Sequence, residues 1–393
     1  REFKSSDIYL YGEEQQFSAS YAAGAMINIL SEIDCFNINH PLSTWKLKYR
    51  SLALKAWRDL DIYLKNLGIV DKSIIKGQGT EISIDNDSQN IVEKKSFKSI
   101  LEASARHQIK IDHIKGSKKL FINDERSVDS QFLLNSIEKY LKSKIKCIDS
   151  NVVSINKCSN EKLALKDVKN NEILFDKVII ACGAWTEKLI NSSKNITKPK
   201  VKSFFGVGSA LLIKSEMSYL DNPKINKIIR TPNRGGTCGI HAVQRQSSLY
   251  IGASSHVTNL PLQYPKCSSI HNLIEGAESL VNLDTYQLGF ETITGYRPVT
   301  ADVVPIVGSL SENLFCIYGT KRDGFTWSPF FSKCIVDNLK GNVSKEWKEF
   351  LNLCSPERNL LSAGTVNECV ESFVLNKKFE YHQHKKHLSV KQL

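Results

Sequence analysis

Short apolar runs separated by polar turns mark most of the strands that the sequence predicts. One set is expected over residues 7–13, 151–155, 178–181, 303–307 and 314–318. The four consecutive apolar positions at 178–181 are typical of a parallel strand that is buried on both faces. Apolar residues recur at helical spacing over 41–67, and further helices are expected over 130–141 and from about Phe325.

Two other stretches read as strands joined by polar turns, without long helical patterns between them. The first lies between 73 and 124, with strands at 81–84 and 107–114, and the second lies between 198 and 294, with strands at 207–214, 239–243 and 249–253. This pattern is typical of an antiparallel sheet. At 393 residues the chain is also too long for one typical core, so the sequence predicts an α/β protein with two domains.

A glycine-bracketed loop, Gly319-Thr320-Lys321-Arg322-Asp323-Gly324, joins the strand at 314–318 to the helix that follows. The first N–H groups of a helix lack internal partners and carry partial positive charge, so this arrangement directs them at an electron-rich ligand. Small residues over 18–26 would likewise let the backbone approach a bulky planar ligand, although they would also suit a helix packed on a sheet.

The apolar run at 7–13 ends in Glu13, as does the second strand of a dinucleotide-binding unit, whose carboxylate accepts hydrogen bonds from a ribose. Glu13 could instead be a turn residue. The GxGxxG turn that should precede such an acid is absent from the sequence, and Gly206-Val207-Gly208 lacks the third glycine. We therefore expect the first strand and the phosphate loop to be missing from this chain.

Composition narrows the class of protein further. The net charge of +12 comes from lysines spread along the chain, with no basic block interleaved with aromatic residues, which favours a solvated basic surface over a nucleic-acid partner. No apolar run reaches the roughly 18 residues of a membrane helix. The ten cysteines show no CxxC pairs, which indicates reduced thiols and a cytoplasmic location. His382, His384 and His387 lack acidic or cysteine companions, so disorder is expected there and no metal site.

The order Arg297-Pro298, Asp302, Pro305-Ile306-Val307-Gly308, then Gly319 and Gly324 resembles the C-terminal signature of the D-amino-acid oxidase superfamily of FAD enzymes, which includes glycine and sarcosine oxidases. The run Ala181-Cys182-Gly183-Ala184-Trp185 resembles that family's A-x-G-A-W segment beside the flavin. The resemblance covers roughly Asp7 to Lys340.

The resemblance implies an FAD-binding, Rossmann-like domain interleaved with an antiparallel-sheet α+β substrate domain. The FAD-binding domain would comprise residues 1–68, 125–200 and 297–345, and the substrate domain residues 69–124 and 201–296. Residues 346–393 would form a partly disordered C-terminal extension. The residues expected at the cofactor are Glu13, Ser20, Gly24, Met26, Val153, Ala181, Gly183, Trp185, Gly319, Arg322, Asp323, Gly324, Phe325 and Thr326.

For the substrate, the resemblance implies that Arg297 clamps a carboxylate as a bidentate fork. Arg322 would be a second carboxylate contact or lie near the flavin, and His241 would face the substrate. Each arginine could instead be a salt-bridge residue, and a lone histidine is more often structural. Sarcosine-oxidase-like members attach FAD through a cysteine at the position of Gly295, so the FAD here should be non-covalent.

The predicted function is oxidation of the C–N bond of a small amine or amino acid by hydride transfer to flavin N5, with O2 or another acceptor taking the electrons. Hydride transfer from a neutral amine needs no catalytic base, which agrees with the lack of a nucleophile–base arrangement. Two alternatives stay open. The chain could be a family member that acts on a modified tRNA nucleoside, or a degenerate flavin-binding or scaffold protein. The sequence does not specify the amine or the oligomeric state.

Overall fold

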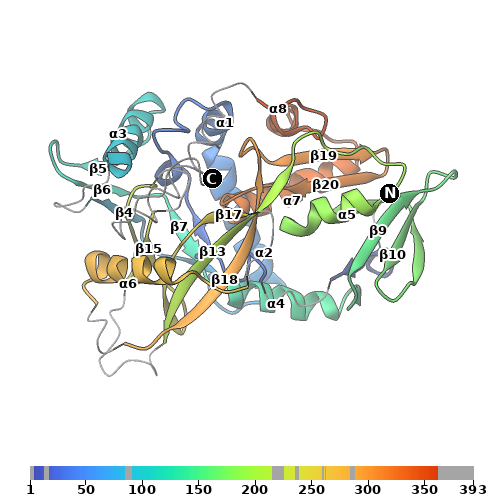
Figure 1. Ribbon diagram of the computed structural model, residues 1–393, viewed down its shortest axis with the longest axis horizontal. Helices are drawn as coiled ribbons and strands as arrows, with labels where there is room; N and C mark the ends of the chain where they lie inside the picture. Colours follow the sequence, from blue (N-terminus) through green and yellow to red (C-terminus); the bar gives the residue numbers. More distant parts are fainter. Residues whose placement is uncertain are drawn as a thin grey trace.

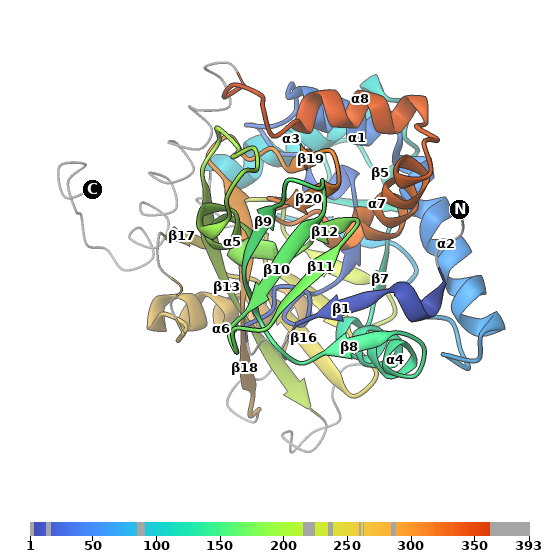
Figure 2. The same cartoon turned by 90° about the vertical axis from the view of Figure 1, so that its right-hand side faces the viewer.

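The computed structural model describes residues 4–12, 17–84, 91–214, 225–234, 239–258, 261, 263–283 and 288–361. Within them, short sheets that contain parallel pairs form one half of the molecule and face the viewer in Figure 2. One pair is β1 with β8, and a second sheet has the order β12–β20–β19, in which β12 and β20 run parallel. An antiparallel sheet, β11–β10–β9, belongs to the same half. These strands are β1 (Tyr9–Tyr11), β8 (Lys146–Ile148), β9 (Val152–Lys157), β10 (Leu163–Asp167), β11 (Glu172–Phe175), β12 (Val178–Ile180), β19 (Ile306–Ser311) and β20 (Leu314–Tyr318).

A large mixed sheet forms the other half. Its order in the described residues is β17–β13–β16–β15–β14–β4–β6–β5, and β18 also pairs with β13. The strands are β4 (Thr80–Ser83), β5 (Asp112–His113), β6 (Lys119–Ile122), β13 (Ser203–Lys214), β14 (Ile228–Arg230), β15 (His241–Gln244), β16 (Ser248–Gly252), β17 (His256–Thr258) and β18 (Glu291–Thr300). A small sheet of β2 (Met26–Ile27), β7 (Arg126–Val128) and β3 (Ile75–Lys76) completes the set.

The helices surround these sheets (Figure 1). They are α1 (Pro41–Lys48), α2 (Arg50–Asn66), α3 (Ile91–Arg106), α4 (Ser130–Lys142), α5 (Thr186–Ser192), α6 (Cys267–Val281), α7 (Gly324–Leu339) and α8 (Lys345–Cys354), with 3-10 turns η1 (Ser5–Asp7), η2 (Leu30–Glu32) and η3 (Gly183–Trp185). In Figure 1, α3 and α6 lie at the end where β4 to β6 and β15 are found, and α5 and α7 lie at the end of β19 and β20. The predicted α/β class is confirmed, while the domain boundaries stay a prediction.

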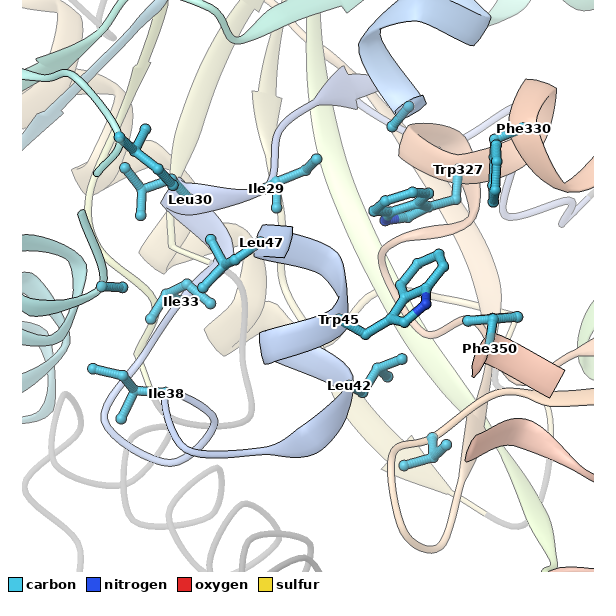
Figure 3. Close-up of a cluster of buried hydrophobic side chains, with 14 of the residues drawn as sticks. Ile29, Leu30, Ile33, Ile38, Leu42, Trp45, Leu47, Trp327, Phe330 and Phe350 are labelled. Atoms are coloured by element: carbon cyan, nitrogen blue, oxygen red, sulfur yellow. The ribbon is translucent and has the colours of Figure 1, made fainter. Parts of the chain in front are cut away.

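Aromatic residues from three helices build one of the buried cores (Figure 3). The ring of Trp45 on α1 lies 4.7 Å from that of Trp327 on α7 and 4.8 Å from that of Phe350 on α8. These three side chains are at most 4% exposed. The core therefore ties the N-terminal helices to the C-terminal ones.

The helix predicted over 41–67 is two helices, α1 and α2. They are separated at Tyr49, whose φ of −105° and ψ of 17° depart from helical values. The break lets α1 direct Trp45 and Leu47 into the aromatic core, while Trp57 of α2 packs in a different cluster with Ile27 and Val128. Apolar spacing alone did not reveal this change of direction.

The strand predicted over 107–114 is wrong for most of its length. A helix that the sequence reading missed, α3, extends to Arg106, and only Asp112–His113 pair as a strand. Phe97, Ile100 and Ala103 form the buried face of α3 and pack in the aromatic core. The start of the predicted strand instead closes this helix, because the N–H groups of His107, Gln108 and Ile109 donate to carbonyls of its last turns and Gln108 has a left-handed φ of 52°.

Two further strands differ from their predictions. The strand expected at 303–307 begins at Ile306, because Val303 adopts a left-handed φ of 53° within a turn. The strand at 178–181 ends at Ile180 and is not buried on both faces, since Ile179 is 43% exposed. Within the described residues β12 pairs with β20 alone, and the cluster that buries Ile180 covers only one of its faces.

Candidate active site

Arg297 lies on the longest strand pair of the large sheet. In the antiparallel register of β13 and β18, Gly206 is opposite Arg297 and Gly208 is opposite Gly295. The guanidinium group of Arg297 lies directly over Gly208, where a Cβ would be 2.0 Å from Nη1. Gly208 therefore makes the space in which this guanidinium group sits.

The guanidinium group of Arg297 has no acidic partner among the described residues. Its Nη1 donates a hydrogen bond of 3.1 Å to the backbone carbonyl of Ser254, and the ion pairs of the described chain do not include it. The side chain is half-buried. A half-buried guanidinium group without a counter-charge is suited to bind an anionic ligand.

Two buried histidines flank this region. Burial, followed by the charges of Lys266 and Arg297, lowers the pKa of His256 to about 4, and both of its ring nitrogens lack hydrogen-bond partners in the described part of the chain. Burial, followed by the charge of Arg230, lowers the pKa of His241 to about 3. Both imidazoles are therefore neutral at pH 7.

The orientation of His241 follows from its contacts. Nδ1 lies 3.1 Å from the backbone carbonyl of Gly239, which can only accept, so Nδ1 carries the proton and Nε2 is an acceptor. The ring stacks on Tyr250 with centroids 5.6 Å apart. A Cβ on Gly24 would lie 2.9 Å from Nε2, so the residue predicted for the substrate and the glycine predicted for the cofactor are direct neighbours.

The small-residue segment at 18–26 runs along this site. Ala22 contacts Gly295, where a Cβ would be 2.7 Å from the Ala22 methyl group, and its carbonyl accepts a hydrogen bond of 3.1 Å from the Tyr250 hydroxyl. Ser20 is exposed. The half-buried side chain of Met26 packs with the cluster around Tyr250. Glu13 lies outside the described residues.

The glycine loop before α7 is tied to the same segment. Thr326 Oγ1 lies 3.2 Å from the carbonyl oxygens of both Met26 and Asn28. Gly319 has a φ of +76°, a value that favours glycine, and Gly324 is the first residue of α7. These contacts hold the loop and the start of the helix against the 18–26 segment, as a shared ligand site requires.

Three side chains of this loop and the start of α7 have protein partners. The ring of Phe325 stacks on Trp57 at 5.9 Å, and Asp323 forms an ion pair with Lys46. Nε of Arg322 lies 3.2 Å from Oε2 of Glu32. This contact favours the interpretation of Arg322 as an ion-pair residue. Because these side chains have protein partners, a ligand would mainly meet the backbone of the loop.

The predicted A-x-G-A-W segment follows the end of β12. Gly183 has a φ of +56°, and a Cβ there would meet no atom within 4 Å. Trp185 packs edge-on against Phe205 and Tyr296 of the large sheet, with centroids 5.0 and 6.0 Å away. Ala181 is exposed, as is Val153 on β9, which is 39% exposed on the separate β11–β10–β9 sheet.

Sequence reasoning missed three residues of this region. Gly208 was considered only as part of an incomplete phosphate motif, and its contact with Arg297 depends on the register of β13 and β18. His256 and Glu32 belong to no motif. Burial and cross-sheet contacts single them out, and neither of these can be read from local sequence.

The described residues fit a flavin at the place where the three segments approach one another. Gly183 leaves open space, and the short residues at 22–25 let this segment pack closely against His241 and Tyr250. The residues that would hold the cofactor are those of 18–26, 181–186 and 319–326. In the described chain, no group of three or more His, Cys, Asp or Glu could hold a metal ion, and no helix is long and apolar enough to span a membrane.

The sequence matches the family described as "FAD dependent oxidoreductase" over residues 13–338. The chain belongs to this family, whose cofactor is FAD. A search of curated proteins finds no match. Among solved structures, the glycine oxidase of Geobacillus kaustophilus is similar, with a TM-score of 0.71, 18% identity and coverage of 89% of this chain and 92% of that one.

Two further solved structures share the fold. The glycine oxidase of Bacillus cereus ATCC 14579 has a TM-score of 0.67 at 17% identity, covering 86% of this chain and 98% of that one. The L-proline dehydrogenase of P. horikoshii has a TM-score of 0.64 at 14% identity, covering 89% and 98%. At these identities the likeness concerns the fold.

Proposed function

We propose that the protein oxidises the C–N bond of a small amino acid, or of another amine that carries a carboxylate. The observation that carries this proposal is the guanidinium group of Arg297, which lies over Gly208 without an acidic partner in the described residues. It is on the same strand as Gly295, which packs against the 18–26 segment. Similar solved structures include glycine oxidases and an L-proline dehydrogenase.

When bound, FAD would supply the hydride acceptor, N5 of its flavin. Arg297 would bind the substrate carboxylate and so fix the direction of the substrate carbon. Because only its Nη1 donates to Ser254, its remaining N–H groups would be available to the ligand. The neutral His241 would accept a hydrogen bond at Nε2 from the amine. The proposal also includes O2 or another molecule as the acceptor of the electrons from the reduced flavin, and a cytoplasmic location for the protein.

Substitution of Arg297 tests the proposal. Arg297→Lys keeps the charge but loses the planar fork, and Arg297→Met removes both. Loss of one member of a buried charge pair costs on the order of 2–5 kcal/mol. We therefore expect kcat/KM for amino acids to fall roughly 30- to several-thousand-fold in Arg297→Met, by the usual conversion. The measurement is anaerobic flavin reduction by amino acids and by amines without a carboxylate.

Arg126→Met is a matched control, because Arg126 also donates only to backbone carbonyls, those of Asn123 and Glu125. FAD content and absorption spectrum should stay near wild type in all variants. Amines without a carboxylate should be oxidised at an unchanged rate by Arg297→Met. An Arg297→Met protein that reduces its flavin with amino acids at the wild-type rate would refute the assignment.

A further inference from the structure

A cavity lies beside Arg245, whose guanidinium group is over the ring of Tyr250. Its volume is about 380 Å³, and its lining comes from the end of β3 and the loop after it, β7, residues 225–227 before β14, and the end of β15 with the turn that follows. The side chains that matter are those of Lys76, Gln78, Ser127, Lys227, Gln244 and Arg245. Three of them are cationic, and none of the described lining residues is acidic. Lys227 alone has a carboxylate partner, Glu81 at 2.5 Å.

Arg245 is the unusual member of this lining. It is only 4% exposed, and Nη2 donates to the carbonyl of Ala23 at 2.5 Å and to Ser130 Oγ at 3.2 Å. Its Nε and Nη1 are buried and have no hydrogen-bond partner in the described part of the chain. Three N–H donors of a buried cation are thus unsatisfied, and such groups are costly unless a ligand or ion meets them.

Asp129, which precedes the Arg245 partner Ser130 in sequence, does not accept from the unsatisfied N–H groups of Arg245. Asp129 accepts from the backbone N–H of Phe132 through Oδ1, as the N-cap of α4, and from that of Gln246 through Oδ2. Neither oxygen accepts from the Arg245 guanidinium group in the described part of the chain, where burial lowers the pKa of Arg245 and the charges of Tyr250 and Asp129 oppose that shift. The face of the Arg245 guanidinium lies 4.7 Å from the Tyr250 ring, a contact that leaves the in-plane N–H groups unpaired.

We propose that this cavity binds a small molecule bearing an oxyanion, a carboxylate or a phosphate group, through Arg245 with Lys76 at the rim. A volume of about 380 Å³ equals that of roughly a dozen water molecules, at about 30 Å³ each. It is therefore sized for a small organic acid or phosphate ester. The Nε2 group of Gln78, whose Oε1 accepts from Asn226, would add a neutral donor, while that of Gln244 donates to the carbonyls of Arg245 and Ser248.

The position of the cavity links it to the candidate active site without making it part of that site. Arg245 holds the carbonyl of Ala23, and the Tyr250 hydroxyl holds that of Ala22, so both fix the segment that runs along the flavin site. Binding at Arg245 is independent of the proposed reaction and can be measured in its absence.

Isothermal titration calorimetry of the FAD-loaded full chain tests the inference, with inorganic phosphate and succinate as separate probes and sodium chloride at matched ionic strength as the blank. Saturable binding of phosphate alone indicates a phosphate ligand, binding of succinate alone indicates a carboxylate ligand, and binding of both indicates a general oxyanion site. Arg245→Gln should weaken binding roughly 10- to 100-fold, the range expected for loss of a charge-assisted hydrogen bond.

Arg245 also holds backbone, so a second variant guards against a folding defect. Lys76→Glu reverses a charge at the rim without touching the contacts of Arg245 and should weaken binding several-fold. Lys55→Glu makes the same charge change on the exposed face of α2 and should bind as wild type. Arg297→Met should also retain binding, which separates this cavity from the candidate active site. Failure of both probes to bind beyond the chloride blank, or equal affinity in Lys76→Glu and Lys55→Glu, overturns the proposal.

Discussion

The position of the Arg297 guanidinium group depends on one glycine on the neighbouring strand. Gly208 is opposite Gly295 in the register of β13 and β18, and the Arg297 side chain crosses over it. Gly206 serves a different purpose, because a Cβ there would lie 2.6 Å from a methyl carbon of Val299 and 3.3 Å from Cβ of Arg297. The two glycines can therefore be separated by experiment.

Gly208→Ala should displace the Arg297 guanidinium group, since an added Cβ would lie 2.0 Å from Nη1. We expect kcat/KM for amino acids to fall roughly 10- to 100-fold, as for loss of a charge-assisted hydrogen bond. Gly206→Ala is the matched control. It should lower the midpoint of unfolding but leave kcat/KM closer to the wild-type value than Gly208→Ala does. Equal losses of kcat/KM in both variants would show that Gly208 does not position Arg297.

Gly295 bears on how the cofactor is attached. A Cβ at this position would lie 2.7 Å from the Ala22 methyl group and 3.0 Å from the Ala19 Cα, so a cysteine side chain has no room without movement of that segment. We therefore expect acid precipitation of the yellow protein to release FAD into the supernatant. Colour that stays with the pellet would contradict non-covalent binding.

These residues show the limit of local sequence. The Arg-Pro pair, the glycine loop and the A-x-G-A-W run predicted the segments of the site, because each is a contiguous stretch with its own backbone requirement. The pairing of Gly208 with Arg297 depends on register between strands about 90 residues apart in sequence, and register is set by the sheet as a whole. The neutrality of His241 and His256 depends on burial, which the sequence around them does not specify.

At the scale of elements, the carboxylate of Glu32 in η2 connects three parts of the chain. Its Oε1 lies 2.7 Å from Nη1 of Arg230 on β14, and its Oε2 lies 3.2 Å from Nε of Arg322 in the glycine loop. The Arg230 side chain is fully buried. Burial alone would raise the pKa of Glu32, but the adjacent Arg322 and Arg230 guanidinium groups hold it well below its usual range.

Glu32→Gln should leave the buried Arg230 and the largely buried Arg322 without their shared counter-charge. Breaking a buried ion pair by removing one partner costs about 3–5 kcal/mol, and we expect a loss of that order in the free energy of unfolding, measured with urea. Glu102→Gln is the control, because Glu102 pairs with Arg106 on an exposed face of α3. That variant should change the free energy by less than about 1 kcal/mol.

The pH dependence of stability checks the same carboxylate. A lowered pKa in the folded protein contributes stability that is fully present above the ordinary value of 4.5 and is lost as the pH falls below it. Wild-type stability should therefore decline on acidification below about pH 4.5, and Glu32→Gln should show a shallower decline. Parallel curves for the two proteins would show that Glu32 is not held ionised by the arginines.

At the scale of the whole molecule, the C-terminal helix is part of the core although it lies beyond the family match, which ends at residue 338. Trp347 and Phe350 of α8 are at most 1% exposed and pack with Phe331 of α7. The sequence reading placed 346–393 in an extension, and its first residues form this helix. The tail with His382, His384 and His387 lies outside the described residues.

The elements that could be predicted from the sequence are those that depend on local pattern alone. Isolated segments such as β20, α4 and the start of α7 were predicted within a residue or so, because each has a clear period and a clear boundary. The missed helix α3 and the break at Tyr49 arise from how helices share a core, as do the contacts of α8. Where these helices form and break depends on packing between distant parts of the chain.

An ion pair between Asp302 and Arg358 fastens the chain after α8 to the turn before β19. Asp302 is fully buried, and Arg358 donates to both of its carboxylate oxygens, from Nε at 3.0 Å and from Nη2 at 2.8 Å. Nη2 also donates to the carbonyl of Val304, and Nη1 donates to those of Cys354 and Ser355. The pair therefore joins the C-terminal segment to the strand that leads from Arg297 toward the glycine loop.

Arg358→Met should leave the Asp302 carboxylate buried without its cation. We expect the free energy of unfolding to fall by about 3–5 kcal/mol, measured by urea denaturation of the FAD-loaded protein. Lys333→Met is the control, since the Lys333–Asp337 pair on α7 is exposed and should contribute less than about 1 kcal/mol. Because the segment after Asp302 leads to β19, β20 and the glycine loop, FAD should also be lost at a lower urea concentration in Arg358→Met than in the control. If both variants unfold at the same urea concentration, the C-terminal segment packs on the core without supporting it.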